Sequence, residues 1–151
     1  MLGLQNGAAG ASGEENKEGE DTSANLAEAK GCTANVSLIK DGIIYCANAG
    51  DSRCVIAQKG LAIDLSHDHK PDNETEKSRI YKAGSEVTEG RVDGNLNLSR
   101  SLGDLKYKRK THLPPEEQPI TGYPDIKEHK ITPDDDFMVM ACDGIWEAKT
   151  S

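Results

Sequence analysis

The fold is decided by residues 34–65, which read ANVSLIKDGIIYCANAGDSRCVIAQKGLAIDL. Short apolar runs in this stretch are separated by turn signals. Asp41-Gly42 is a dipeptide that tolerates the positive φ angles of a two-residue hairpin turn, and Gly50-Asp51-Ser52 and Lys59-Gly60 turn the chain again. The pattern therefore predicts an antiparallel meander of four strands, over residues 34–40, 43–48, 53–58 and 61–65.

One helix and three more strands are predicted farther along the chain. Asn73 and Glu76 have the spacing of a capping box, and Gly84 is suited to end the helix that they begin. That helix has a narrow apolar face, through Ile80 and Ala83. Further strands are predicted over residues 86–88, 96–99 and 137–141. A helix combined with antiparallel strands places the chain in the α+β class.

The length of 151 residues is enough for one domain, and the composition excludes several classes of protein. A net charge of −8 argues against a nucleic-acid binder and against a basic membrane-surface segment. No apolar run approaches the roughly 18 residues that a membrane span needs. The four cysteines form no Cys-x-x-Cys pair and lie mostly in apolar runs. This favours reduced thiols in an intracellular protein over a disulfide framework or a zinc site.

Residues 1–30 differ in composition from the remainder, residues 31–151. They contain six acidic residues and little apolar surface. Such a segment cannot bury enough apolar area to offset the entropy of ordering, so it is predicted to be disordered. Two interpretations remain open for it, an acidic docking arm and a solvated tail or linker.

Three acidic residues stand next to glycines at predicted turns. Asp51 follows Gly50, Asp104 follows Gly103, and Asp143 follows the apolar strand 137–141 closely. A carboxylate at the end of a strand is held by a rigid backbone and is accessible to an ion. Hard divalent cations prefer oxygen ligands in that setting. Each pair, taken alone, is also an ordinary turn pair.

Several segments resemble, in order and spacing, the signature segments of the metal-dependent protein phosphatase family, also called type 2C or PPM. The resemblance covers roughly residues 31–149. It is carried by residues 31–34 (GCTA), 47–53 (ANAGDSR), 68–71 (DHKP), 91–104 (RVDGNLNLSRSLGD), 124–125 (PD) and 141–146 (ACDGIW). Residues 113–118 (LPPEEQ) are similar to the largely nuclear gamma-type branch, whose members carry a long acidic insertion, and residues 1–30 look like the tail of such an insertion.

The resemblance implies an antiparallel β-sandwich flanked by helices, with metal ions in a cleft at one end. It implies a protein serine/threonine phosphatase in which water held on Mg²⁺ or Mn²⁺ attacks the phosphoryl group. By position, Asp143 matches an aspartate that binds a core metal, and Asp51 matches one associated with a weaker metal. Glu147 stands where many relatives have another aspartate of that weaker site. The implied partners are phosphoprotein substrates, and the chain is expected to be a monomer of the cytoplasm, the nucleus or both.

The remaining motif residues are expected to be structural. Arg91, Arg100 and Asp104 match positions that pair around loops, His69 is expected to be hydrogen-bonded rather than a metal ligand, and Trp146 is expected to pack beneath its loop. Residues 134–136 (DDD) predict a solvated loop. The basic run 106–110 (KYKRK) is by default an exposed loop face, and contact with a phosphorylated or acidic substrate is the other interpretation.

Three of the family's metal-site segments do not occur in the sequence: an early arginine/acid segment, Asp-Gly-His-Gly-Gly, and a late Asp-Asn. The resemblance therefore predicts an incomplete domain, a fragment of an active phosphatase that is inactive by itself and contains no catalytic acid or base. A non-catalytic, truncated phosphatase-like interaction module is the alternative. A calcium-binding protein is excluded because the acids do not have the spacing of a calcium loop.

Overall fold

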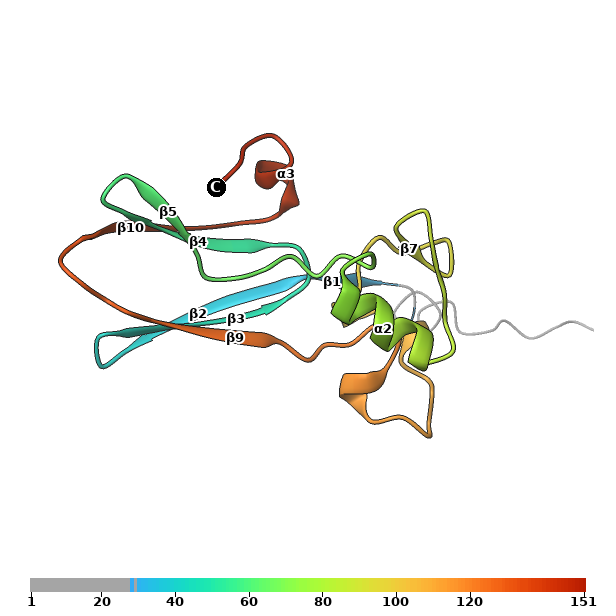
Figure 1. Cartoon of the computed structure of the whole chain (residues 1–151). Helices are drawn as coiled ribbons and strands as arrows, with labels where there is room; N and C mark the ends of the chain where they lie inside the picture. The colour runs from blue at the N-terminus through green and yellow to red at the C-terminus, as the bar shows by residue number, and fades with distance from the viewer. Residues whose placement is uncertain (1–27, 29) are drawn as a thin grey trace, which may run out of the picture.

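Two three-stranded antiparallel sheets face each other as two layers (Figure 1). The computed structural model describes Glu28 and residues 30–151, so the predicted disordered segment lies almost entirely outside the described residues. One sheet has the order β2 (Ala34–Lys40), β3 (Ile43–Ala49) and β9 (Asp125–Lys130). The other has the order β10 (Asp135–Ala141), β4 (Arg53–Gln58) and β5 (Leu61–Asp64).

The shorter elements gather mainly beyond one end of these sheets. Helix α2 (Glu74–Lys82) lies there, and helix α3 (Asp143–Trp146) follows β10 (Figure 1). Two short antiparallel pairs are formed by β1 (Gly31–Cys32) with β8 (Leu102–Gly103) and by β6 (Val87–Thr88) with β7 (Arg91–Val92). The 3-10 helices η1 (Leu105–Tyr107) and η2 (Pro115–Glu117) lie in the loop before β9. No helix in the described part of the chain is long and apolar enough to cross a membrane.

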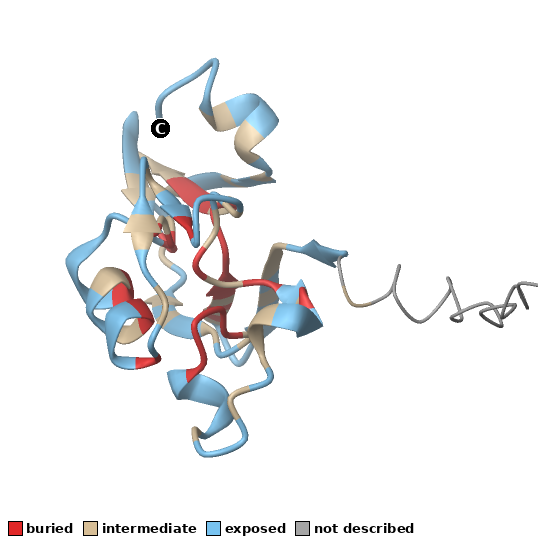
Figure 2. Ribbon diagram, turned by 90° about the vertical axis from the view of Figure 1, so that its right-hand side faces the viewer, coloured by how far each residue is buried: buried red, intermediate tan, exposed pale blue. Residues whose placement is uncertain are grey.

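Two apolar clusters hold these elements together. The first lies between the sheets and contains buried side chains of both, Ile44 and Cys46 from β3 and Cys54 and Ile56 from β4. Figure 2 shows buried residues concentrated inside and exposed residues on the outer surfaces. Several large apolar side chains remain exposed on the sheets, among them Val36, Leu38, Ile126 and Phe137. The outer faces of the sheets are thus not covered by other described residues.

The two predicted hairpin turns are confirmed. The φ angles are 51° and 73° at Asp41 and Gly42, and 51° and 75° at Lys59 and Gly60. Two consecutive positive φ angles are the signature of a type I′ turn, whose twist matches that of the flanking strands. Strand β2 pairs with β3, and β4 pairs with β5, through these turns. The α+β class and the antiparallel sandwich are therefore confirmed.

The predicted single meander is wrong, because β3 and β4 belong to different sheets. The chain crosses between the layers at Gly50, where φ is 121°. A Cβ atom there would lie 2.4 Å from Cγ2 of Thr33, so the crossing requires glycine. Alternating burial along β3 is compatible with either arrangement, since it reports which face is buried and not which strand lies alongside.

Strand β9 was not predicted. Its sequence, DIKEHK, is rich in charged residues that are depleted in strands, yet it pairs with β3 from Ile43↔Lys130 to Asn48↔Asp125. The predicted strand 96–99 is wrong, since only Leu96 makes an isolated bridge, to Val92. The loop prediction is wrong for Asp135 and Asp136, because both belong to β10. The carboxylate of Asp135 is also not solvated, since it accepts hydrogen bonds from Thr132, His129 and Gln58.

Helix α2 packs on the second apolar cluster through its predicted face. Ile80 joins Val92 and Ile120, all fully buried, and Ala83 is also buried. Gly84, with φ 77°, follows the end of the helix as predicted. The predicted capping box is wrong. The Asn73 side chain donates to the carbonyl of Asp68 instead, and the Glu76 carboxylate points into the interior.

Candidate functional site

Asp51 and Asp143 lie at the same end of the β4–β10 pair. Arg53 pairs with Ala141 at that end of the ladder. Asp51 lies in the turn two residues before Arg53, and Asp143 begins helix α3 two residues after Ala141, so both acids follow from the same end of the ladder. The strand register thus puts two turns that are far apart in the sequence at the same end of one sheet.

Asp51 is almost fully buried, with 3% of its surface exposed. Its carboxylate forms an ion pair with the ammonium group of Lys70, which lies in the turn before α2. A buried carboxylate without a partner would be costly, so Lys70 supplies the charge that allows Asp51 to be buried here.

Asp143 and Glu147 lie one helical turn apart around α3. The backbone N–H of Glu147 donates to the carbonyl of Asp143 at 2.7 Å. Asp143 is half-buried and Glu147 is exposed. The indole N–H of Trp146 donates to the carbonyl of Ala141 at 2.8 Å, and the guanidinium of Arg53 lies over its ring. Trp146 therefore packs beneath this turn, as expected.

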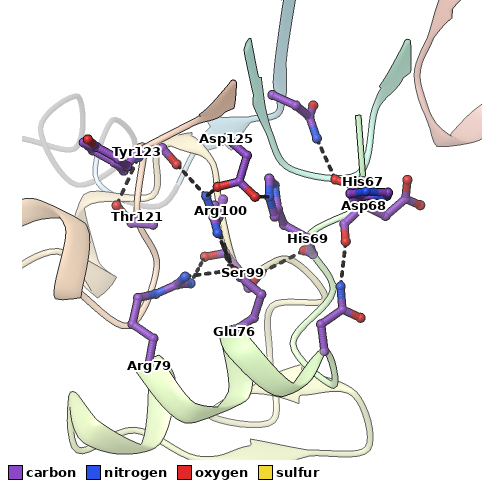
Figure 3. A network of polar contacts seen from close by, with 12 residues as sticks. His67, Asp68, His69, Glu76, Arg79, Ser99, Arg100, Thr121, Tyr123 and Asp125 are labelled. Carbon is purple, nitrogen blue, oxygen red and sulfur yellow. Dashed lines mark hydrogen bonds and ion pairs between the residues drawn. The ribbon is translucent and has the colours of Figure 1, made fainter. Parts of the chain in front are cut away.

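A buried ionic network is centred on Glu76 of α2 (Figure 3). Its carboxylate accepts hydrogen bonds from Nη2 of Arg100 at 2.6 Å, Nη1 of Arg79 at 2.6 Å and Oγ of Ser99 at 2.8 Å. Burial raises the pKa of Glu76, but the hydrogen bond from Arg100 and the charge of Arg79 outweigh burial and lower this pKa to about 2. Glu76 is therefore ionised at neutral pH.

The network continues from Arg100 to the Gly50–Asp51 turn. Arg100 donates to Oδ1 of Asp125 at 2.7 Å, and Oδ2 of Asp125 lies 3.1 Å from Nε2 of His69. Nδ1 of His69 accepts a hydrogen bond from the backbone N–H of Gly50 at 3.1 Å. A neutral imidazole that accepts at Nδ1 carries its proton on Nε2, so His69 donates to Asp125 (Figure 3). Burial raises the pKa of Asp125, but the bonds from His69 and Arg100 outweigh it and lower this pKa.

The family model for protein phosphatase 2C matches residues 4–151. The chain belongs to the protein phosphatase 2C family. It is 56% identical over 122 residues to protein phosphatase 2C homolog 2 of Schizosaccharomyces pombe, a match that covers 80% of this chain and 33% of the relative. It is 55% identical over 124 residues to protein phosphatase 2C homolog 2 of Aspergillus fumigatus, a match that covers 82% of this chain and 29% of the relative. The chain thus spans about a third of the length of these curated relatives.

Two solved structures resemble the fold. A phosphatase from a pathogenic strain of Toxoplasma gondii matches with a TM-score of 0.66 and 42% identity, over 70% of this chain and 33% of that one. A sex determining protein of C. elegans matches with a TM-score of 0.72 and 28% identity, over 85% of this chain and 31% of that one. The antiparallel sandwich is therefore the arrangement expected of a 2C-family chain.

The carboxylates of this 2C-family chain are suitable ligands for a divalent cation, but the described residues do not group enough of them to form a metal site. Asp51, Asp143 and Glu147 are carboxylates, the ligands that hard cations prefer. No group of three or more His, Cys, Asp or Glu side chains among residues 28 and 30–151 is arranged to hold a metal ion. The Asp51 carboxylate is also engaged by Lys70. The described residues therefore bring Asp51 and Asp143 to one end of the sheet without forming a closed cation site.

Four other motif residues make the loop contacts that their structural interpretation predicts. His69 is buried and hydrogen-bonded at both nitrogens, and Arg100 is ion-paired twice. Asp104 accepts a bond from Ser101 at 2.6 Å, and Arg91 donates to the carbonyl of Asn95 at 2.8 Å. Sequence reasoning missed Glu76, because its capping-box spacing offered a simpler role. Glu76 lies four residues before Ile80, on the same face of the helix, and this spacing could have predicted that its carboxylate faces the interior.

Proposed function

We propose that this chain is part of a metal-dependent protein serine/threonine phosphatase that hydrolyses phosphoserine and phosphothreonine. The observation that carries the proposal is the pairing of β4 with β10, which puts the turns that contain Asp51 and Asp143 at the same end of the sheet. The names of relatives more than 50% identical to the chain support the same activity. The substrates proposed on this basis are phosphoproteins.

We assign Asp143 to a core cation and Asp51 and Glu147 to a weaker one, with Mg²⁺ or Mn²⁺ as the metal. Such cations supply an activated water and neutralise phosphoryl oxygens. The described residues contribute by positioning the proposed ligands. The pairing of β4 with β10 holds the two turns that contain them, and Trp146 supports the turn of Asp143. The other ligands are assigned to sequence that the relatives have and this chain does not span.

A chimera tests this proposal. Residues 31–151 replace the matching third of the Schizosaccharomyces pombe phosphatase, and hydrolysis of a phosphothreonine peptide is measured with Mn²⁺. We expect activity in the chimera, with a loss of at least about a hundredfold in its Asp143→Ala variant, because a charged metal ligand is removed. Asp136→Ala, an exposed acid on β10, is the matched control and keeps full activity. A folded chimera that binds Mn²⁺ but hydrolyses nothing overturns the proposal.

One observation favours a second function for the 151-residue chain by itself, a non-catalytic interaction module. The described residues contain no group arranged to hold a metal ion. The isolated chain is then expected to show no Mn²⁺-dependent hydrolysis above buffer. Measurable hydrolysis that is abolished by Asp143→Ala would exclude this second function.

We further propose a monomer, located in the cytoplasm or nucleus, that belongs to the gamma-type branch. The resemblance of residues 113–118 to that branch and the four free cysteines support this assignment. Light scattering of the chimera tests the monomeric state, and fluorescence imaging of a tagged chain in cells tests the location. A dimer, or a tagged chain found only outside cells, contradicts them.

A further inference from the structure

The most basic part of the described chain is the segment Lys106–Lys110, which contains four cations in five residues. The structure fixes its backbone. The buried Gln118 accepts a bond from the backbone N–H of Lys110 at 3.1 Å and donates to its carbonyl at 2.8 Å. Tyr107 packs against the second apolar cluster. The cationic side chains are therefore presented on an ordered loop, which lowers the entropy lost when a ligand binds.

Three of the four cations face outward. Lys108 turns inward, where its ammonium donates to the carbonyl of Ser101 at 2.6 Å. Lys106 and Arg109 are exposed, and Lys110 is half-buried. The lysine ion pairs within the described residues are those of Lys59, Lys70 and Lys77, so Lys106 and Lys110 have no carboxylate partner among those residues.

The loop has a hollow on each side. One has a volume of about 410 Å³ and is lined by Arg109 and Lys110 together with the apolar side chains of Leu113 and Pro115. The other has a volume of about 310 Å³ and is also lined by Arg109 and Lys110. It contains one acid, Asp93, whose carboxylate is already used by Ser85 and by the backbone of Glu86. A ligand crossing the loop would therefore meet cations on both sides, with Leu113 and Pro115 in one hollow and Tyr107 and Pro119 in the other.

The structure shows which anion fits this surface. The carboxylate of Glu28 forms an ion pair with the guanidinium of Arg109, whose side chain remains 59% exposed. The group already bound is thus a glutamate side chain on a peptide. This bound carboxylate favours an acidic peptide over nucleic acid as the ligand.

We propose that Lys106, Arg109 and Lys110 form a docking surface for an acidic peptide segment of a partner protein, and that Glu28 is an internal competitor for Arg109. Acidic side chains of the peptide pair with the three cations, and an apolar side chain enters the hollow beside Leu113 and Pro115. The contacts are exposed charge pairs, so binding is modest in affinity, fast and sensitive to salt.

Fluorescence anisotropy of the full 151-residue chain tests the proposal without depending on catalysis. The probe is a short fluorescein-labelled peptide rich in glutamate with one leucine, compared with a peptide in which glutamine replaces every glutamate. We expect saturable binding of the acidic peptide alone. Reversal of two charges in Arg109→Glu/Lys110→Glu weakens it about tenfold or more, and Glu28→Gln tightens it about twofold to fivefold by removing the competitor.

The matched control is Lys40→Glu/Lys130→Glu, which changes net charge equally at two exposed lysines of β2 and β9. It is expected to weaken binding less than about twofold at physiological salt, since distant charges are screened. The proposal is overturned if the acidic peptide does not bind, if both double variants weaken binding equally, or if Glu28→Gln weakens binding. It is also overturned if a single-stranded RNA of equal charge binds as tightly as the peptide.

Discussion

The backbone N–H of Gly50 donates a hydrogen bond to Nδ1 of His69 at 3.1 Å. This contact connects the crossing between the two sheets to the buried ionic network, because the other nitrogen of His69 faces Asp125. The turn that carries Asp51 is therefore held by residues that contact neither a cation nor a substrate in the proposed reaction.

His69→Ala is expected to destabilise the chain by about 2–4 kcal/mol, because it leaves a buried backbone N–H without an acceptor and creates a cavity. Urea unfolding followed by circular dichroism measures the change. His112→Ala, at an exposed position, is the control and is expected to cost less than about 0.5 kcal/mol. In addition, ¹H–¹⁵N spectra should show the Nε2–H tautomer for His69. The Nδ1–H tautomer would contradict the hydrogen-bond pattern.

Glu76→Ala is expected to destabilise the chain by about 3–5 kcal/mol, because it leaves Arg79 and Arg100 partly buried without their shared partner. The free energy of unfolding in urea measures this change. Glu74→Ala, an exposed acid in the first turn of the same helix, is the matched control. If the two substitutions lowered the free energy of unfolding equally, the buried network would not contribute to stability.

The contribution of Glu76 is expected to depend on pH. Its pKa is about 2 in the folded chain, below its ordinary value of 4.5. A lowered pKa means that the contribution is complete above pH 4.5 and is lost as the pH falls from 4.5 to 2. The difference in unfolding free energy between the wild type and Glu76→Gln should therefore shrink over this range. A difference that stays constant down to pH 2 would contradict this prediction.

Lys70→Ala is expected to destabilise the chain by about 1–3 kcal/mol, since it leaves the carboxylate of Asp51 buried without a counter-charge. A double-mutant cycle with Asp51→Asn measures the coupling between the two residues in thermal or urea unfolding. We expect Lys70→Ala to cost less in the Asp51→Asn background. Additive effects would mean that the ion pair contributes no coupling energy.

Gly50→Ala is expected to cost about 2–5 kcal/mol, because the new Cβ would contact Thr33 and φ is 121°. Gly42→Ala is the matched control, with a positive φ of 73° but no atom within 4 Å of the new Cβ. It is expected to cost about 1–2 kcal/mol, from backbone strain alone. Melting temperatures of the two variants measure the difference, and a smaller loss at Gly50 would contradict the steric argument.

Local structure was predictable where neighbouring residues decide it. The Asp41-Gly42 and Lys59-Gly60 turns, the bounds of β2 and β4 and the helix end at Gly84 follow from φ preferences and apolar periodicity, which act within a few residues. The motif segments also indicated the family, which the match over residues 4–151 bears out. The candidate site was predictable only in part, because Asp51 and Asp143 carry recognisable turn signals, whereas Lys70 and Glu76 do not.

The sequence by itself thus determined the hairpins, the helix and the family, because backbone sterics and residue order contain that information. Only the tertiary structure decided that β3 and β4 lie in different sheets, that the charged strand β9 pairs with β3, and that Glu76 faces two arginines instead of capping its helix. The physical reason is that strand pairing and burial of charge depend on partners far along the chain. A carboxylate such as Glu76 can be buried only where folding brings the opposite charges to it.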